Sequence, residues 1–158
     1  MILISHRGNL NGPNPERENS TSYIEEAISS GYEVEIDLWL IGNTLFLGHD
    51  NPQYEITLDW LITRSYLLWV HCKNIEAIEY LNKIDTGRIN YFWHQNDDVT
   101  LTSLGFIWAY PGKQPISRSV AVLPELNNFK DLDSCYGACS DYVKKMEDEN
   151  STYSYRSI

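Results

Sequence analysis

The segment Glu33-Val-Glu-Ile-Asp-Leu-Trp-Leu-Ile41 has the pattern of a strand buried within a sheet. Its two carboxylates, Glu35 and Asp37, are two residues apart and therefore share one face, while the apolar residues between them take the other face. Gly42-Asn43 follows as a turn, and Leu45 to Leu47 continues as a short extension. We take Glu33–Ile41 as the strand around which the sheet is arranged.

Short apolar runs and helical patterns alternate along the rest of the chain. Tyr23 to Ile28 has helical spacing, and Ser22 and Glu25 nearby have the spacing of a capping box. A second helix is expected after the cap residue Asn74, and a shorter one at Leu58–Ile62. Further strands are expected at Ile2–Ser5, Tyr66–Cys72, Ile89–Trp93, Phe106–Tyr110, Ser119–Leu123 and Tyr136–Ser140.

Strands that alternate with helices predict an α/β protein with a parallel sheet. The strands are apolar runs rather than clean alternations, which suits burial on both faces. An open doubly wound sheet and a closed barrel both satisfy this pattern. A full barrel usually needs about 250 residues, and the segment between Tyr110 and Ser119 is too short for a full helix.

Length and composition indicate one folded domain. The chain has 158 residues, of which 42% are hydrophobic and 22% are charged, as is ordinary for a folded protein. We expect this domain over residues 1–143. Residues 144–158 form a polar C-terminal tail, the one segment for which the sequence suggests disorder.

The charge balance excludes several classes of partner. There are 12 Lys and Arg against 22 Asp and Glu, a net charge of -10, which disfavours nucleic acid and anionic lipid surfaces. No apolar run is long enough for membrane insertion, and no feature indicates a protein partner. Cys72, Cys135 and Cys139 make an odd count without a secretory signal, so we expect reduced thiols and a cytoplasmic protein.

Polar residues gather where strands end. All four histidines end or directly follow a predicted strand: His6, His49, His71 and His94. In a parallel α/β protein that edge is where sites form. Taken singly, each feature has an ordinary structural explanation, such as a turn histidine or an exposed edge strand. Their joint occurrence at one edge, with Glu35 and Asp37, favours a site for a divalent cation.

Four segments match a known family in order and spacing. They are Ile4-Ser-His-Arg-Gly8, Glu18-Asn19-Ser20, Glu35-Ile-Asp37 and Gly48-His49-Asp50. Together they resemble the glycerophosphodiester phosphodiesterase family of the PLC-like phosphodiesterase superfamily, whose order is HRG, E-N-T, E-x-D and H-D. Two later segments are collinear but less specific. Val70-His-Cys-Lys73 lies where the family has E-x-K, and Tyr136-Gly-Ala-Cys-Ser-Asp-Tyr142 resembles G-x-x-T-D.

The resemblance implies a compact family member with a small, irregular TIM-like (β/α) barrel. It also implies a metal-dependent phosphodiesterase that hydrolyses a small glycerol- or polyol-phosphodiester. The roles it assigns are general acid and base for His6 and His49, phosphate binding for Arg7 and Lys73, and metal binding for Glu35 and Asp37. Supporting roles near the metal or substrate fall to Glu18, Asp50, His94 and Glu125.

One departure from the family pattern affects the metal. His71 stands where the family has a third carboxylate ligand. Carboxylates favour Mg²⁺ or Ca²⁺, which we expect first, whereas an imidazole ligand also opens the site to Mn²⁺ or Zn²⁺.

Other functions stay open. One is a lyase-type relative that forms a cyclic phosphate, and another is a non-catalytic member that binds a phospho-ligand. A flavodoxin-like binding domain fits less well, because the loop Gly8–Pro15 has no helix directly behind it.

Overall fold

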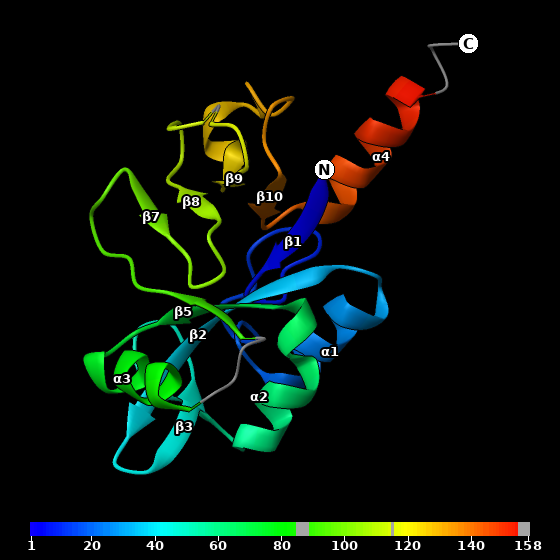
Figure 1. Ribbon diagram of the computed structural model, residues 1–158. Coiled ribbons are helices and arrows are strands. Elements are labelled where there is room, and N and C mark those ends of the chain that lie inside the picture. Colours follow the sequence, from blue (N-terminus) through cyan, green and yellow to red (C-terminus); the bar gives the residue numbers. More distant parts are fainter. Residues whose placement is uncertain (85–88, 115, 155–158) are drawn as a thin grey trace.

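The computed structural model describes residues 1–84, 89–114 and 116–154, with side chains to residue 148 (Figure 1). The described strands are β1 (Ile2–His6), β2 (Glu33–Ile41), β3 (Thr44–Leu47), β4 (Tyr54–Ile56), β5 (Leu68–Cys72), β6 (Asn90–Phe92), β7 (Val99–Leu101), β8 (Ile107–Ala109), β9 (Ser119–Val122) and β10 (Gly137–Ser140). The helices are α1 (Thr21–Ser29), α2 (Leu58–Arg64), α3 (Ile75–Lys83) and α4 (Val143–Ser154), with short 3-10 turns η1 (Ser65–Leu67) and η2 (Pro124–Asn127).

All ten described strands belong to one mixed sheet. β1 pairs in parallel with β2 on one side and with β10 on the other. From β2 the parallel order continues to β5 and β6, and from β10 it continues to β9 and β8. The hairpin of β3 and β4 extends β2, and β7 pairs with β8; these pairings are antiparallel.

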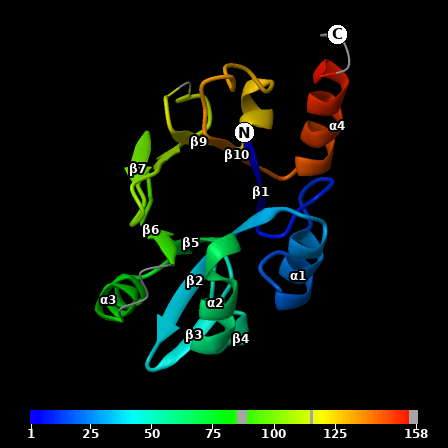
Figure 2. The same ribbon diagram turned by 45° about the vertical axis from the view of Figure 1, so that its right-hand side comes forward.

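The expected TIM-like barrel is wrong. The sheet curls into a half-barrel, and helices do not alternate with its strands (Figures 1 and 2). The reason lies in the second half of the chain, where connections are loops: the described residues between β8 and β9 contain no helix, and β9 reaches β10 with only η2 between them. Only α1, α2 and α3 follow a strand of the first half in the manner of an α/β protein.

Most of the predicted elements are confirmed. β2 has the expected bounds, and the other expected strands and helices lie within a few residues of their predicted positions. Asn74 caps α3, since its side chain accepts a hydrogen bond from the Ala77 amide. The expected capping box is wrong, because Ser20 rather than Ser22 caps α1. The three-residue strands β4 and β7 were not predicted.

Residues 144–154 are helical, as part of α4, where the sequence suggested disorder. Val143 and Met146 of α4 are buried, and the hydroxyl of Tyr32 donates a hydrogen bond to Glu147. Residues 155–158 lie outside the described residues. The three cysteines are free and buried, as expected of reduced thiols. None of the described helices combines the length and apolar character needed to cross a bilayer.

Two apolar clusters lie on opposite faces of the sheet. One joins Val34, Ile36 and Leu38 of β2 to residues of α1, α2 and α3. The other lies on the inner face of the curl and is built from β1, β5, β6, β8, β9 and β10, with Ile4, Trp69, Phe92, Trp108, Val120, Val122 and Cys139. Because side chains alternate along a strand, residues two further along also point inward. The second cluster therefore forms a floor beneath the C-terminal ends of these strands.

Candidate functional site

Above this floor, the strand ends bring charged side chains together. His6 of β1 lies opposite Glu35 of β2, and Asp37 lies opposite His71 of β5. All four side chains point to the inner face of the sheet. His6 and His71 each lie two residues after an inward-facing residue, Ile4 and Trp69, and Glu35 and Asp37 lie opposite inward-facing residues of the neighbouring strands. The register of three parallel strands thus creates a cluster of acidic and basic groups.

Asp37 is the most heavily contacted carboxylate of the cluster, and its residue is fully buried. One oxygen lies 3.2 Å from Nδ1 of His71 and 3.3 Å from Nζ of Lys73. The other lies 3.1 Å from Nε of Arg7 and accepts a 2.8 Å hydrogen bond from Asn19. Burial alone would raise the pKa of Asp37, but contact with His71 and the charges of Arg7 and Lys73 hold it well below its usual range.

Glu35, unlike Asp37, has few polar contacts. It is 3% exposed, and its Oε2 has no hydrogen-bond partner among the described residues. Oε2 lies 3.9 Å from Nε2 of His6, and Oε1 lies 3.9 Å from Nδ1 of His71. Burial, together with the charge of Asp37, raises the pKa of Glu35. A buried carboxylate without a partner is costly, so this group favours a cation beside it.

The hydrogen bonding of His71 defines which ring nitrogen faces the carboxylates. Its Nε2 lies 3.0 Å from the backbone carbonyl of His94, and because a carbonyl only accepts, Nε2 carries the proton. In the charged ring, Nδ1 contacts Asp37 through an N–H, which is a contact that lowers the Asp37 pKa. In the neutral ring, Nδ1 presents a lone pair to Glu35 and Asp37. Three electron-rich atoms facing one another repel unless a proton or a metal ion lies between them.

Glu35, Asp37 and His71 can hold a divalent cation. One ligand atom from each lies within 4.8 Å of the other two. Ligands around one divalent ion are separated by roughly 3 to 5 Å, so the described positions fit a metal without rearrangement of the strands. The orphaned Oε2 of Glu35 and the tautomer of His71 agree with this fit.

His6 pairs with a residue that was not predicted as part of the site. Its Nδ1 donates a 2.8 Å hydrogen bond to Asp141, directly after β10. Burial lowers the pKa of His6, but the Asp141 bond and the charge of Glu35 outweigh it, so the net pKa is raised. Asp141 is the aspartate of the segment that resembles G-x-x-T-D, and this match is the feature of the sequence that could have predicted it as a site residue.

Two asparagines complete the network and were also missed. Asn9 is fully buried and donates 2.8 Å hydrogen bonds to both Glu18 and Asp141. Glu18 in turn accepts a 3.3 Å bond from Arg7. Asn19, besides its bond to the Asp37 carboxylate, accepts a 2.9 Å bond from the Asp37 amide. Only Asn19 had a sequence signal, since it lies in the segment that resembles E-N-T.

The β1–α1 connection positions these groups through an unusual backbone. Arg7 and Asn19 both have positive φ, at 56° and 62°, and the Asn19 amide donates a 3.1 Å bond to the Arg7 carbonyl. The loop thus returns to its starting point and holds Glu18 and Asn19 beside the end of β1.

His49 lies beside the cluster rather than within it. It lines a pocket of about 260 Å³ that also has His71, Lys73 and His94 in its walls. Its Nδ1 lies 2.7 Å from the carboxylate of Asp50, whose side chain is 86% exposed. Burial and the charge of Arg7 lower the pKa of His49. His6 is not among the residues that line this pocket.

The remaining predicted residues have different places. Glu125 accepts hydrogen bonds from the Ser140 hydroxyl at 2.8 Å and the Asp141 amide at 2.9 Å, so it stabilises the turn that carries Asp141. His94 is buried in the wall of the pocket.

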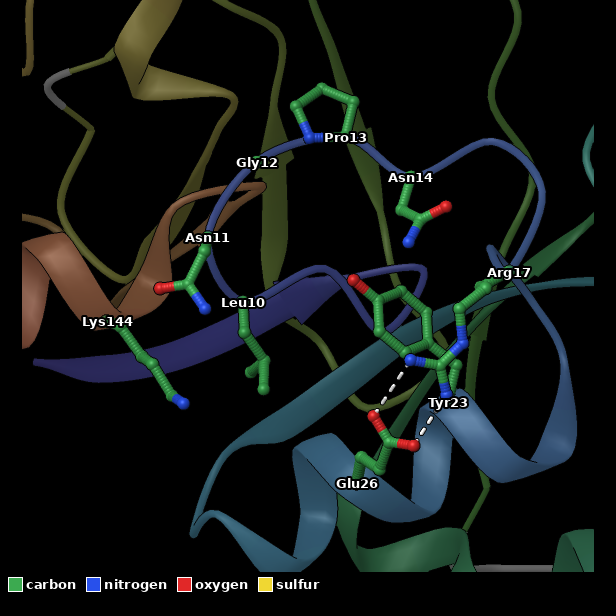
Figure 3. Close-up of a pocket in the computed structure, with 9 residues that line it drawn as sticks. All are labelled: Leu10, Asn11, Gly12, Pro13, Asn14, Arg17, Tyr23, Glu26 and Lys144. Atoms are coloured by element: carbon green, nitrogen blue, oxygen red, sulfur yellow. Dashed lines mark hydrogen bonds and ion pairs between the residues drawn. The ribbon is translucent and has the colours of Figure 1, made fainter.

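A second pocket, of about 480 Å³, lies between the β1–α1 loop, α1 and the start of α4 (Figure 3). Arg17 in its wall is ion-paired to Glu26 and stacks over the ring of Tyr23 at 4.4 Å. Its lining contains none of the predicted site residues.

A comparison with models of protein families found no match, and neither did a comparison with curated proteins. The resemblance to the phosphodiesterase family therefore stays a prediction.

Proposed function

We propose that this chain is a metal-dependent phosphodiesterase of the glycerophosphodiester phosphodiesterase type, acting on a small glycerol- or polyol-phosphodiester. The observation that carries the proposal is the pair of buried carboxylates, Glu35 and Asp37, with Nδ1 of His71 facing both of them. Such a pair at strand ends, surrounded by cationic side chains, suits a metal centre that receives an anion.

Charge balance supports a cation in this cluster. Four carboxylates take part in its contacts: Glu18, Glu35, Asp37 and Asp141. Arg7 and Lys73 are its permanent cations. When all four carboxylates are ionised, His6 is charged as its raised pKa favours, and His71 is neutral, the cluster has an excess of one negative charge and repels a phosphodiester. A divalent ion would offset this excess and, when bound, would polarise the phosphoryl oxygens.

Arg7 and Lys73 are suited to hold the phosphate. Arg7 uses Nη1 for Glu18 and places Nε near Asp37, which leaves other guanidinium N–H groups for an oxyanion. Lys73 contacts Asp37 but also lines the 260 Å³ pocket. Both can therefore contact an anion placed between the carboxylate pair and the pocket.

The two imidazoles have pKa values displaced in opposite directions. Asp141 and Glu35 outweigh burial to raise the pKa of His6, whereas burial and Arg7 lower that of His49. Phosphodiester cleavage needs one group to protonate the leaving oxygen and one to deprotonate the nucleophile. We assign His6 as the proton donor and His49 as the proton acceptor, because the first favours the charged form and the second the neutral form.

The proposal is tested by adding single metal ions back to metal-stripped protein. Cleavage of bis(p-nitrophenyl) phosphate and of glycerophosphodiesters is measured with Mg²⁺, Ca²⁺, Mn²⁺ or Zn²⁺ added singly. We expect metal-dependent cleavage that falls by about 100-fold or more in His6→Ala and in Glu35→Gln. Glu26→Gln is the matched control, since Glu26 lies in the second pocket, and it should retain activity.

The products separate the alternatives. A cyclic phosphate would identify attack by a hydroxyl of the substrate and a lyase-type enzyme. Binding of Mn²⁺ and phosphate without turnover of any diester would contradict the enzymatic proposal and favour a non-catalytic phospho-ligand-binding protein.

A further inference from the structure

The geometry points to a subsite for the alcohol part of the substrate in the 260 Å³ pocket, with His94 as the residue that recognises a neutral hydroxyl group on that alcohol. This inference rests on the proposed function, and it adds a residue that determines specificity. It excludes alcohols that carry an ammonium group.

His94 has unused hydrogen-bonding capacity in the wall of this pocket. It is 7% exposed, yet neither ring nitrogen has a hydrogen-bond partner among the described residues. Its backbone is held in place, because its carbonyl accepts the bond from His71. Buried polar groups usually have partners, and an imidazole left without one costs free energy. Both nitrogens are buried, so a hydroxyl in the pocket reaches one of them when the His94 ring turns toward it, and that contact would supply the missing partner.

The chemistry of a neutral imidazole matches a hydroxyl. The ring offers one N–H donor and one acceptor nitrogen, and a hydroxyl is also both donor and acceptor. A site built to bond a hydroxyl discriminates strongly against an analogue without it, because the polar groups of the site are then left unpaired.

Aromatic rings beside His94 suit the carbon skeleton of a small polyol. Tyr110 makes an edge contact with the His94 ring at 4.1 Å between centroids, and its hydroxyl donates a 3.3 Å bond to the Gln95 carbonyl. Trp93 also lines the pocket. Flat apolar walls with a few polar groups are typical of small-ligand sites, and this pocket is small for such a site.

The charges of the pocket disfavour a cationic alcohol. Lys73 lines it, and none of the described lining residues is a carboxylate. An ammonium group would therefore be repelled by Lys73 and would contact no carboxylate among the described lining residues. The alcohol expected here is small, uncharged and hydroxylated.

The test compares two chromogenic diesters with the same leaving group: glyceryl p-nitrophenyl phosphate and propyl p-nitrophenyl phosphate, which lacks the hydroxyls. For the wild-type enzyme with its activating metal, we expect kcat/KM to favour the glyceryl ester by about 10- to 100-fold. His94→Phe should reduce this ratio about tenfold or more, chiefly through KM. His94→Gln, which keeps a donor and an acceptor, should restore part of the ratio.

Each contrary outcome has its own meaning. Equal kcat/KM for the two esters, or an unchanged ratio in His94→Phe, would overturn the subsite and leave the proposed function intact. If the wild type cleaves neither ester with any metal, the proposed function fails. The subsite is then judged by calorimetry in the presence of Mn²⁺. Tighter binding of glycerol phosphate than of propyl phosphate, lost in His94→Phe, would support it, and equal binding would overturn it.

Discussion

The identity of a single ring nitrogen decides the chemistry of the cluster. His71 donates from Nε2 to a backbone carbonyl and so turns Nδ1 toward Glu35 and Asp37. In metal sites generally, a hydrogen bond from the ring nitrogen that does not bind the metal fixes the tautomer of the ligand histidine. At this scale the proposed metal centre depends on a carbonyl of the neighbouring strand end as well as on the three side chains that could hold the ion.

Replacing His71 tests its proposed role as a metal ligand. His71→Glu should shift the metal preference toward Mg²⁺ and Ca²⁺ and away from Zn²⁺, by about tenfold in relative affinity, because a hard oxygen ligand and one more negative charge replace an imidazole. Isothermal titration of metal-stripped protein with each ion measures the change. An unchanged order of affinities would mean that His71 is not a ligand.

The His6–Asp141 pair gives a prediction about pH. Asp141→Asn removes the main group that raises the pKa of His6, so the His6 pKa should fall, as measured by NMR titration of the metal-free protein. The raised His6 pKa stabilises the fold at low pH, and this contribution is lost as pH rises through the folded-state value. The Asp141 pKa is lowered because its bond to His6 outweighs burial, so its contribution is lost as pH falls below the usual aspartate range.

The wild type should therefore exceed Asp141→Asn in free energy of unfolding most clearly between about pH 5 and pH 6. A difference that instead grows steadily toward pH 9 would contradict the assigned pair.

Among the elements, β2 is the one on which the site depends. It lies between β1 and β5, and its alternating pattern directs Val34, Ile36 and Leu38 to the helices while Glu35 and Asp37 face inward. That alternation was visible in the sequence. The contacts that complete the site were not, because a buried asparagine such as Asn9 carries no local signal of which distant carboxylates it will bond.

The close approach of β1 and β10 gives a prediction at the scale of the strands. A Cβ at Gly137 would lie 2.5 Å from Cγ1 of Ile2 and 3.1 Å from its carbonyl oxygen. Gly137→Ala should therefore lower the free energy of unfolding by about 1–3 kcal/mol, as measured by urea denaturation.

Ile2→Ala removes the nearest atom and serves as the control. In that background the loss caused by Gly137→Ala should be smaller, because only the backbone contact remains. Additive effects of the two substitutions would show that the predicted steric contact is not the cause.

For the whole molecule, the sequence predicted the parts better than their assembly. The apolar runs in the sequence located β1, β2 and β10, which pair in parallel in the structure. The barrel was wrong because strand count and closure depend on connections such as the segment between β8 and β9, where described residues form loops in place of helices. The three-residue strands β4 and β7 depend on pairing with a neighbour rather than on a pattern of their own.

Metal binding should stabilise the entire fold, because the ligands come from two strands at the centre of the sheet. At a Mn²⁺ concentration about 100 times the dissociation constant, binding to the folded state should raise the free energy of unfolding by about 2.7 kcal/mol. For a chain of this size, that corresponds to an increase in Tm of roughly 5–10 °C. Differential scanning calorimetry measures the shift.

Asp37→Asn should abolish most of this increase, whereas Glu26→Gln should keep it. An equal increase in both variants would place the ion elsewhere on this acidic protein.

The most direct measurement of the central claim is anomalous X-ray scattering from crystals equilibrated with Mn²⁺. We predict a peak bounded by carboxylate oxygens of Glu35 and Asp37 and by Nδ1 of His71, at metal–ligand distances of about 2.0–2.6 Å. Well-occupied Mn²⁺ at other positions, with no peak between these three side chains, would contradict the metal centre and the phosphodiesterase proposal that depends on it.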